Sequence, residues 1–478
     1  MSWTQVSPIR YERPFDSIEQ FYRTVAAAGA PLNKEHYLIT CTVRLQSPLP
    51  PVHAVEQAWK ALRHVYPQLA AEPEIGGGER FAYDVLTSAT ELNAWTRATF
   101  HVEPDRSADD LYEQLAPSPR FHLYYLLGTS ELVFRTPHWR IDGIGLLHLQ
   151  SAFLQLLADG TKPILDGTEP SRLCPSLDAV VAGISPAPAS SLAATAAAAD
   201  EELQPFLYEG RTLTLPTLPN ILPTTPKRLL RSIDSGTTDR LLSACSTRKI
   251  TVTAAAHAAL ALAARQFSLT PQQEQQDYVG FNAIDLRRYL PVPWNGPDAA
   301  ISLYHTGLPF RMPLHPSSPA CIGSAEAETA ATTTTALRET EFVRLANAFT
   351  SLYRRDLAQE TPRNVFGFLP AYVDKVMQVL SRAPTDPRQG PAHPELSSMG
   401  KLNELLATEV KGTERTLRVA EWWVAVEVIN RLLLTNVWTW DHQLVLSVNW
   451  NEAFYERELV EGLFGRWREE LVMGLIGE

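Results

Sequence analysis

The chain has 478 residues, of which 45% are hydrophobic and 20% are charged, a balance typical of soluble globular proteins. This chain is longer than an ordinary domain with a single hydrophobic core, so its length predicts two domains or two lobes of one fold. The formal net charge of −11 argues against a nucleic-acid-binding protein, because such proteins normally need a basic face.

The cysteines and the N-terminus exclude further classes. Cys41, Cys174, Cys245 and Cys321 are widely separated. Since no pair has CxxC spacing, we predict neither a zinc site nor a redox dithiol, and no metal. The N-terminus lacks a basic start followed by an apolar run, and no apolar run reaches the roughly 18 residues that a membrane-spanning helix needs. We therefore expect a cytoplasmic protein without membrane or nucleic-acid partners, and a monomer.

The chain up to Gly183 predicts an alternation of helices and strands. Apolar residues at helical spacing predict helices, and runs of β-branched and aromatic residues predict strands. Gly128-Thr129-Ser130 lies between two such runs and is a hairpin signal, and Asp159-Gly160 is typical of a helix C-terminus. The helices expected are 17–28, 52–66, 108–115 and 144–158, and the strands are 36–45, 81–86, 121–127 and 131–135.

The most informative stretch is Arg135-Thr136-Pro137-His138-Trp139-Arg140-Ile141-Asp142-Gly143-Ile144-Gly145, between the hairpin and the helix 144–158. A histidine at a strand-to-helix turn can be presented into a cleft, and a neutral imidazole can take a proton from a hydroxyl or an amine. We predict that His138 is a general base. Asp142 is expected to pair with an arginine and fix the loop, and Gly143 lets the backbone bend. The alternative is a histidine satisfied inside a turn.

Residues 184–226 change in character, because alanine and proline dominate them, and they predict a linker or crossover. We therefore divide the chain into an N-terminal lobe, 1–183, this linker, 184–226, and a C-terminal lobe, 227–478. Thr237 or Thr238 is expected near a helix cap. The strands expected in the second lobe are 227–233, 277–284, 431–438 and 443–450, and the helices are 237–246, 254–266, 339–358 and 455–473. Residues 320–340 are expected to be a loop or a weak helix, and 382–394 a surface loop.

Two short segments of the second lobe are candidates for the same site. Asp285-x-Arg287 follows an apolar strand. Taken alone, this segment is typical of a surface charge pair. Because it stands at a strand end, Arg287 is also the candidate partner of Asp142, since a planar guanidinium can bind a carboxylate through two hydrogen bonds. Ser397-Ser398-Met399-Gly400 offers small hydroxyl residues that suit a ligand or an oxyanion. A plain turn after a proline-rich loop is the equal alternative.

Other catalytic motifs are absent from the sequence. There is no G-x-S-x-G elbow, no Walker A loop, no H-E-x-x-H and no GxGxxG after a strand. His148 and His257 lie on apolar helix faces and are expected to be core or rim residues. His305 is a weaker second candidate for the catalytic histidine.

The segment His138-Trp-Arg-Ile-Asp142-Gly143 resembles the HxxxDG motif of the CoA-dependent acyltransferase superfamily. That superfamily includes BAHD-type acyltransferases, the condensation domains of peptide synthetases and fungal trichothecene O-acetyltransferases. The resemblance spans nearly the whole chain and is greatest to the fungal stand-alone branch related to trichothecene 15-O-acetyltransferase. Further segments that carry it are 52–66, Thr251-Val-Thr-Ala-Ala-Ala-His257, Asp285-Leu-Arg287-Arg-Tyr-Leu-Pro291, Ser397-Ser-Met-Gly400 and Ser447-Val-Asn-Trp-Asn-Glu-Ala-Phe454.

This resemblance implies an α/β fold of two chloramphenicol-acetyltransferase-like lobes, with mixed sheets flanked by helices and a tunnel between the lobes. It implies that His138 deprotonates an acceptor and that Asp142 pairs with Arg287 for structure. The implied reaction moves an acyl group, expected to be acetyl, from acetyl-CoA or another acyl-CoA to a hydroxyl of a hydrophobic secondary metabolite. The acyl-CoA is a co-substrate, and no bound cofactor is expected. The candidates for binding the small-molecule acceptor or CoA are Ser397, Ser398, Trp139 and Tyr304.

The chain also departs from parts of the superfamily. Pro137 stands where condensation domains usually carry the first of two adjacent histidines, and no carrier-protein segment is present, so amide-forming condensation is disfavoured. The DFGWG motif of plant BAHD enzymes is absent. The alternative to acyl transfer is a condensation-like fold reused as a non-acylating cyclase or pericyclase, a dehydratase or a binding protein.

Overall fold

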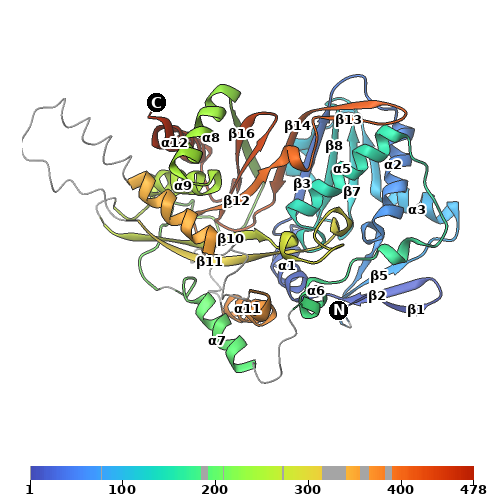
Figure 1. Cartoon of the computed structure of the whole chain (residues 1–478), viewed down its shortest axis with the longest axis horizontal. Helices are drawn as coiled ribbons and strands as arrows, with labels where there is room; N and C mark the ends of the chain where they lie inside the picture. Colours follow the sequence, from blue (N-terminus) through green and yellow to red (C-terminus); the bar gives the residue numbers. More distant parts are fainter. Residues whose placement is uncertain are drawn as a thin grey trace, which may run out of the picture.

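The computed structural model describes residues 2–76, 78–184, 192–207, 209–271, 274–314, 341–355, 365–382 and 390–477. Two mixed sheets form the centres of two halves, which lie side by side in Figure 1. Across the described ranges, no helix is both long and apolar enough to cross a membrane.

A six-stranded sheet organises the first half. Its strands lie in the order β13 (Glu409–Lys411), β14 (Thr416–Val426), β3 (Ile39–Leu45), β8 (Glu131–Thr136), β7 (His122–Leu126) and β6 (Phe100–Glu103). Because side chains alternate along a strand, β7 sends Leu123 and Tyr125 to one core and Tyr124 and Leu126 to another. The helices α2 (Val52–Val65) and α5 (Gly143–Asp159) cover the first face, and α4 (Ala108–Gln114) covers the second.

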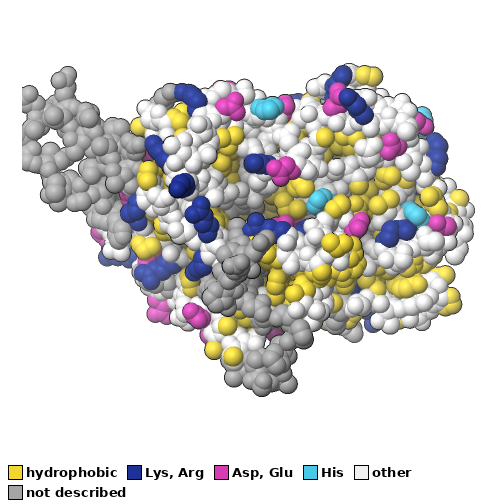
Figure 2. Space-filling view, viewed as in Figure 1, with side chains coloured by type: hydrophobic (Ala, Val, Ile, Leu, Met, Phe, Trp, Pro, Cys, Tyr) yellow, Lys and Arg dark blue, Asp and Glu magenta, His cyan; other side chains and the backbone are white. Residues whose placement is uncertain are grey.

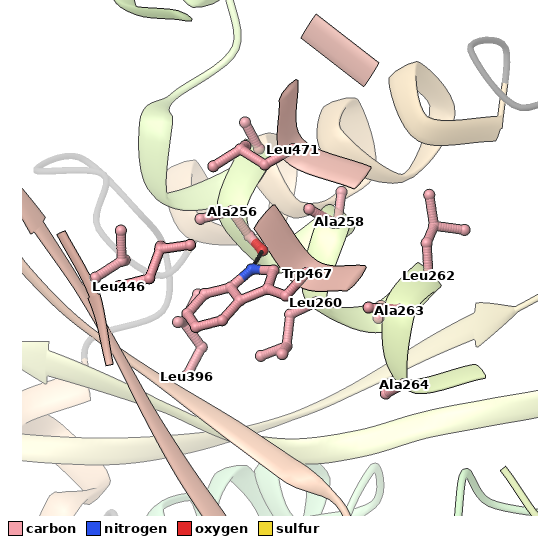
Figure 3. Close-up of a cluster of buried hydrophobic side chains, with 14 of the residues drawn as sticks. Ala256, Ala258, Leu260, Leu262, Ala263, Ala264, Leu396, Leu446, Trp467 and Leu471 are labelled. Atoms are coloured by element: carbon pink, nitrogen blue, oxygen red, sulfur yellow. Dashed lines mark hydrogen bonds between the residues drawn. The ribbon is translucent and has the colours of Figure 1, made fainter. Parts of the chain in front are cut away.

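The second half is built on a four-stranded sheet in the order β12 (Pro394–Lys401), β15 (Leu433–Trp440), β16 (Gln443–Asn451) and β9 (Pro226–Ile233). The helices α8 (Ser235–Arg248), α9 (Val252–Phe267) and α12 (Arg457–Ile476) pack together beside it. A buried run of small side chains on α9 lets α12 approach closely, and Trp467 of α12 donates its indole N–H to the carbonyl of Ala256 at 2.8 Å (Figure 3). This pairing buries the largest side chain of α12 without leaving its donor unsatisfied.

A long hairpin, β10 (Gln276–Asp285) and β11 (His305–Leu314), reaches from the second half toward the first (Figure 1). Its open end places Asp285 opposite His305. A small sheet near the N-terminus has the order β1 (Thr4–Ser7), β2 (Arg10–Pro14), β5 (Arg80–Asp84) and β4 (Glu72–Glu74). The remaining helices are α1 (Ser17–Ala27), α3 (Ala89–Thr99), α6 (Leu177–Ile184), α7 (Leu192–Leu203), α11 (Val365–Ser381) and residues 341–355.

Most of the expected elements are confirmed, with ends shifted by a few residues. α5 ends at Gly160, whose φ of 64° is the left-handed conformation that glycine adopts without a steric penalty. Parts of the expected linker and loops, 185–191, 208, 315–340 and 383–389, lie outside the described residues. Within the described linker, α7 is a regular helix.

Three expectations about local structure were wrong or incomplete. The helix expected at 237–246 begins at Ser235, and its cap is Asp234 rather than Thr237 or Thr238, because the Asp234 carboxylate accepts from the Thr237 amide at 2.9 Å. Residues 397–400 are part of strand β12 rather than a turn, since they pair in parallel with β15. No strand was predicted at β14, yet it enters the first half's sheet beside β3 (Figure 1).

Candidate functional site

His138 lies where β8 ends and α5 has not yet begun. Pro137 cannot continue the strand's hydrogen-bond ladder, and His138 starts a short 3-10 turn, His138–Arg140, that precedes the cap of α5. The imidazole is half-buried and stacks on Tyr22 of α1, with ring centroids 4.2 Å apart and an interplanar angle of 6°. The ring is therefore held in a fixed plane by a residue that sequence periodicity did not single out.

The protonation state of His138 follows from its surroundings. Burial lowers the pKa of His138 to about 3, and the nearby His305 lowers it further, whereas its own carbonyl and Asp142 act in the opposite direction. The ring is thus neutral near pH 7. Its Nδ1 atom is enclosed without a hydrogen-bond partner of good geometry in the described part of the chain. A general base needs its lone pair on the nitrogen that meets the substrate, so this role requires the proton on Nδ1 and the lone pair on Nε2.

Asp142 turns away from this ring and caps α5. Its Oδ1 atom accepts from the Gly145 amide at 2.8 Å, and both carboxylate oxygens lie 2.8 Å from Nη1 of Arg287. Oδ2 also accepts from the Tyr304 amide at 2.9 Å. Burial alone would raise the pKa of Asp142, but Arg287, His305 and the Gly145 amide outweigh it and the pKa is lowered. Asp142 is therefore ionised, and both of its carboxylate oxygens accept hydrogen bonds that hold the turn in place.

The Asp142–Arg287 pair predicted from the sequence is present, and it joins the two halves of the chain. Arg287 is 2% exposed. Besides Asp142, its guanidinium donates to Asp285 at 3.1 Å, to the Ser302 hydroxyl at 3.0 Å and to the Ala299 carbonyl at 3.2 Å. Burial would lower the pKa of Arg287, but the two carboxylates raise it, so the guanidinium stays charged.

The other candidate residues are not all gathered around His138. Trp139 is buried in an aromatic cluster with Phe15 and donates its indole N–H to Glu35 at 3.0 Å. Tyr304 is buried, and its hydroxyl donates to the Pro175 carbonyl at 2.8 Å. Both side chains are thus occupied by protein contacts. Their proposed contact with substrate or CoA remains a prediction that these contacts do not favour.

The two candidate serines face different surroundings. The Ser398 hydroxyl is 2.7 Å from that of Thr253 on α9. Ser397 lies on the opposite face of β12 from Ser398, and the pairing with β15 is irregular between Ser398 and Gly400. Met399 reaches Gly143, because a Cβ added at Gly143 would lie 2.8 Å from the terminal methyl of Met399. Strand β12 therefore lies beside the HxxxDG segment at Met399.

Three further residues join the site, and the sequence had singled out only one of them, His305. Tyr22 stacks on His138, Tyr37 makes an edge contact with it at 6.2 Å, and His305 lies 5.4 Å away, all measured between ring centroids. Tyr37 has a φ of 66°, a conformation unusual for a bulky residue. The sequence marked His305 only as a weak candidate, and it carried no signal for the other two.

Two other features of the surface do not belong to this site. A pocket lined by residues such as Trp3, Pro175 and Trp294 contains none of the candidate residues, and apolar side chains gather around this end of the molecule, near α6 and β2 (Figure 2). His64, Asp166 and Glu169 come together as potential metal ligands. However, Arg172 lies 3.0 Å from His64 Nε2 and Thr168 donates two hydrogen bonds to Asp166, so we assign no metal to them.

Comparison with known proteins decides the family. Acetyltransferase pigO of Monascus ruber is 30% identical to the chain over 475 residues, which cover 95% of this chain and 94% of pigO. The chain belongs to the CoA-dependent acyltransferase superfamily. The O-acetyltransferase pigM of the same organism is 27% identical over 96% of this chain and 85% of its own length. No family model matches the chain. The resemblance stated from the HxxxDG segment is thereby confirmed, and the protein is an acyltransferase.

Solved structures confirm the fold of this acyltransferase. Trichothecene 15-O-acetyltransferase from Fusarium sporotrichioides superposes with a TM-score of 0.80 at 18% identity, covering 99% of this chain and 98% of that one. The starter condensation domain of rhizomide synthetase, in complex with C8-CoA, superposes with a TM-score of 0.58 at 14% identity over 98% of this chain and 95% of that one. The predicted α/β architecture with two mixed sheets is therefore correct.

Gly145, two residues after the HxxxDG segment, has no room for a side chain, and Gly143, within the segment, is a matched control. A Cβ at Gly145 would lie 2.1 Å from the Ala300 carbonyl oxygen and 2.9 Å from Arg287 Nη2. At Gly143 the nearest atoms belong to the flexible end of Met399. We expect Gly145→Ala to lower the free energy of unfolding by about 3 kcal/mol, at the upper end for overpacking, and Gly143→Ala by about 1 kcal/mol or less. Urea denaturation measures both. Equal losses would show that the backbone near Ala300 yields easily.

Proposed function

We propose that this acyltransferase moves an acetyl group from acetyl-CoA to a hydroxyl of a hydrophobic secondary metabolite, with His138 as the general base. The observation that carries this proposal is the His138 ring itself, which is neutral and half-buried and makes no hydrogen bond to another described residue, while Asp142 pairs with Arg287. The names of pigO and pigM support the acetyl group, and the C8-CoA complex of a condensation domain supports a CoA thioester as donor.

The reaction follows from this geometry by ordinary acyl-transfer chemistry. Nε2 of His138 takes the proton of the acceptor hydroxyl as its oxygen bonds to the thioester carbonyl carbon. The electrons of the carbonyl π bond move to the carbonyl oxygen. When they return, the C–S bond breaks, and the CoA thiolate takes the proton from His138. The ester and free CoA are the products, and the imidazole returns to its neutral state.

We also propose that the lobes meet at this site. Residues 1–183 and 227–478 would form the two lobes, joined by 184–226, with β13 and β14 crossing from the second lobe into the first lobe's sheet. The Asp142–Arg287 ion pair, between residues 145 positions apart, supports a site at the seam between the lobes. An acceptor and a CoA thioester could then reach His138 from different sides.

Transfer assays and ligand-induced stabilisation together test this function. The purified chain is incubated with acetyl-, butyryl- and octanoyl-CoA and with a panel of polyketide and terpenoid alcohols, and mass spectrometry detects the added acyl group. We expect acetyl transfer to a hydroxyl. We also expect acetyl-CoA to raise the melting temperature, because a ligand that binds only the folded state stabilises it. If millimolar acetyl-CoA gives no acyl transfer and no shift in melting temperature, the result would favour a non-acylating cyclase, dehydratase or binding protein.

A further inference from the structure

We propose that His305 is a second catalytic imidazole, which donates a hydrogen bond to the thioester carbonyl oxygen as that oxygen becomes negatively charged. This inference rests on the proposed acyl transfer and adds a residue to it. The HxxxDG segment carries a single histidine, His138, with Pro137 before it. In the fold a second imidazole arrives beside His138 from β11, which belongs to the other half of the chain.

The two histidines are positioned by the same ion pair. His138 lies four residues before Asp142, on the turn that Asp142 caps. His305 follows Tyr304, whose amide donates to Asp142, and it lies opposite Asp285, which accepts from Arg287. Both histidines are therefore adjacent to residues of one buried cluster. The hydrogen bonds and the ion pair of that cluster set the relative position of the two rings.

The two rings are close enough to act on the same reacting group. Their centroids are 5.4 Å apart at an interplanar angle of 41°. Tyr22 contacts both rings, at 4.2 Å and 5.3 Å, and so closes one side of the pair. In the proposed step the acceptor hydroxyl lies at His138 and the carbonyl oxygen at His305, each at a hydrogen-bond distance of about 2.7–3.2 Å. The arrangement suits a carbonyl group held between a base and a hydrogen-bond donor.

An unsatisfied ring nitrogen distinguishes His305 from a structural histidine. His257 is also fully buried, but both its nitrogens are bonded, Nδ1 to the Tyr353 hydroxyl at 2.8 Å and Nε2 to that of Tyr278 at 3.3 Å. His305 Nε2 is enclosed and has no partner among the described residues. The proposed role requires that this enclosed Nε2 carry the lone pair. The N–H is then on Nδ1, which forms no hydrogen bond within the described chain and is free for a ligand.

The chemistry of the step favours a neutral donor at this position. Burial lowers the pKa of His305, with Asp142 and Arg287 acting in opposite directions, so the ring is a hydrogen-bond donor rather than an acid. The His305 ring keeps its N–H proton throughout the reaction, while His138 carries the proton taken from the acceptor hydroxyl. Preorganised donors in water-poor sites act most strongly where charge develops. Ser398, an alternative donor, already shares its hydroxyl hydrogen bond with Thr253.

The test compares two replacements of similar size. His305→Gln keeps an N–H donor, and His305→Leu does not. Each is assayed for acetyl transfer to the acceptor and for acetyl-CoA hydrolysis without an acceptor, since both reactions pass through a charged carbonyl oxygen. We expect His305→Leu to lower kcat about 10²–10³-fold in both reactions, with KM for acetyl-CoA changed little, and His305→Gln to recover at least tenfold over His305→Leu. His53→Leu, in the exposed first turn of α2, is the control and should keep wild-type activity.

The outcomes separate this inference from the proposed function. Wild-type activity with a melting temperature preserved in His305→Leu overturns the role of His305 alone. A loss of transfer with hydrolysis unchanged also overturns it, because His305 would then bind the acceptor. Equal losses in the Leu and Gln variants point to a packing role and overturn it too. If the wild-type protein transfers no acyl group to any acceptor, the proposed function fails, and the role of His305 fails with it.

Discussion

The His138→Ala variant is expected to transfer acetyl groups at least 10²–10⁴-fold more slowly than the wild-type protein, while unfolding at nearly the same urea concentration. The first effect follows because the variant has no base at the turn to take the acceptor's proton. The second follows because the ring makes no hydrogen bond to another described residue, so its removal costs mainly the stacking on Tyr22. Single-turnover transfer measured by mass spectrometry, beside urea denaturation, checks both. Near-normal turnover would reject His138 as the base.

The pH dependence of transfer gives a second readout of the same residue. A general base works in its unprotonated form, so the rate falls only as the pH drops through the pKa. Because burial lowers the pKa of His138 to about 3, kcat/KM should stay level from pH 8 to about pH 5, where a free histidine of pKa about 6.5 would already be mostly protonated. The reaction with a reactive, non-ionisable acceptor isolates this effect. An acid limb near pH 6.5 would show that water reaches the ring in the working enzyme.

Breaking the Asp142–Arg287 pair should be the largest single loss of stability at the site. Arg287→Ala leaves a carboxylate buried at 3% exposure without its counter-ion, and removing one partner of a buried ion pair typically costs about 3–5 kcal/mol. Asp142→Ala should cost at least as much, because it also removes the acceptor for the Gly145 and Tyr304 amides. Urea denaturation measures the free energy of unfolding, and a lower soluble yield should accompany both variants.

Two further variants show whether the loss belongs to the buried pair. Arg457 and Glu461 form an exposed ion pair on α12, with side chains 60% and 40% exposed, so Arg457→Ala should cost no more than about 0.5 kcal/mol. The double variant Asp142→Ala/Arg287→Ala should lose less than the sum of the single variants, because it leaves neither charge alone. An Asp142→Ala protein that folds stably but is inactive would show that Asp142 takes part in the chemistry rather than in bracing the turn.

Much of the local structure could be predicted because its causes are local. The strand β8, the turn at His138 and the start and end of α5 follow from a hydrophobic run, Pro137, the capping Asp142 and Gly160, which are close together in the sequence. The HxxxDG segment and the partner Arg287 were also found, since a buried aspartate at a helix cap needs a cation and Arg287 stands at a strand end. The boundary errors at Asp234 and at residues 397–400 arose where short polar segments suit a turn, a cap or a strand equally well.

The sequence by itself determined the candidate residues for the chemistry and where most of the helices and strands that carry them lie. Only the tertiary structure decided which of these residues meet. Strand β14 reads as an ordinary amphipathic stretch, and its place beside β3 depends on pairing between segments near opposite ends of the chain. His257 and His305 both follow apolar patterns, yet one has two tyrosine partners and the other faces His138. Such differences arise from strand register and packing between segments distant in the chain, which periodicity and capping do not encode.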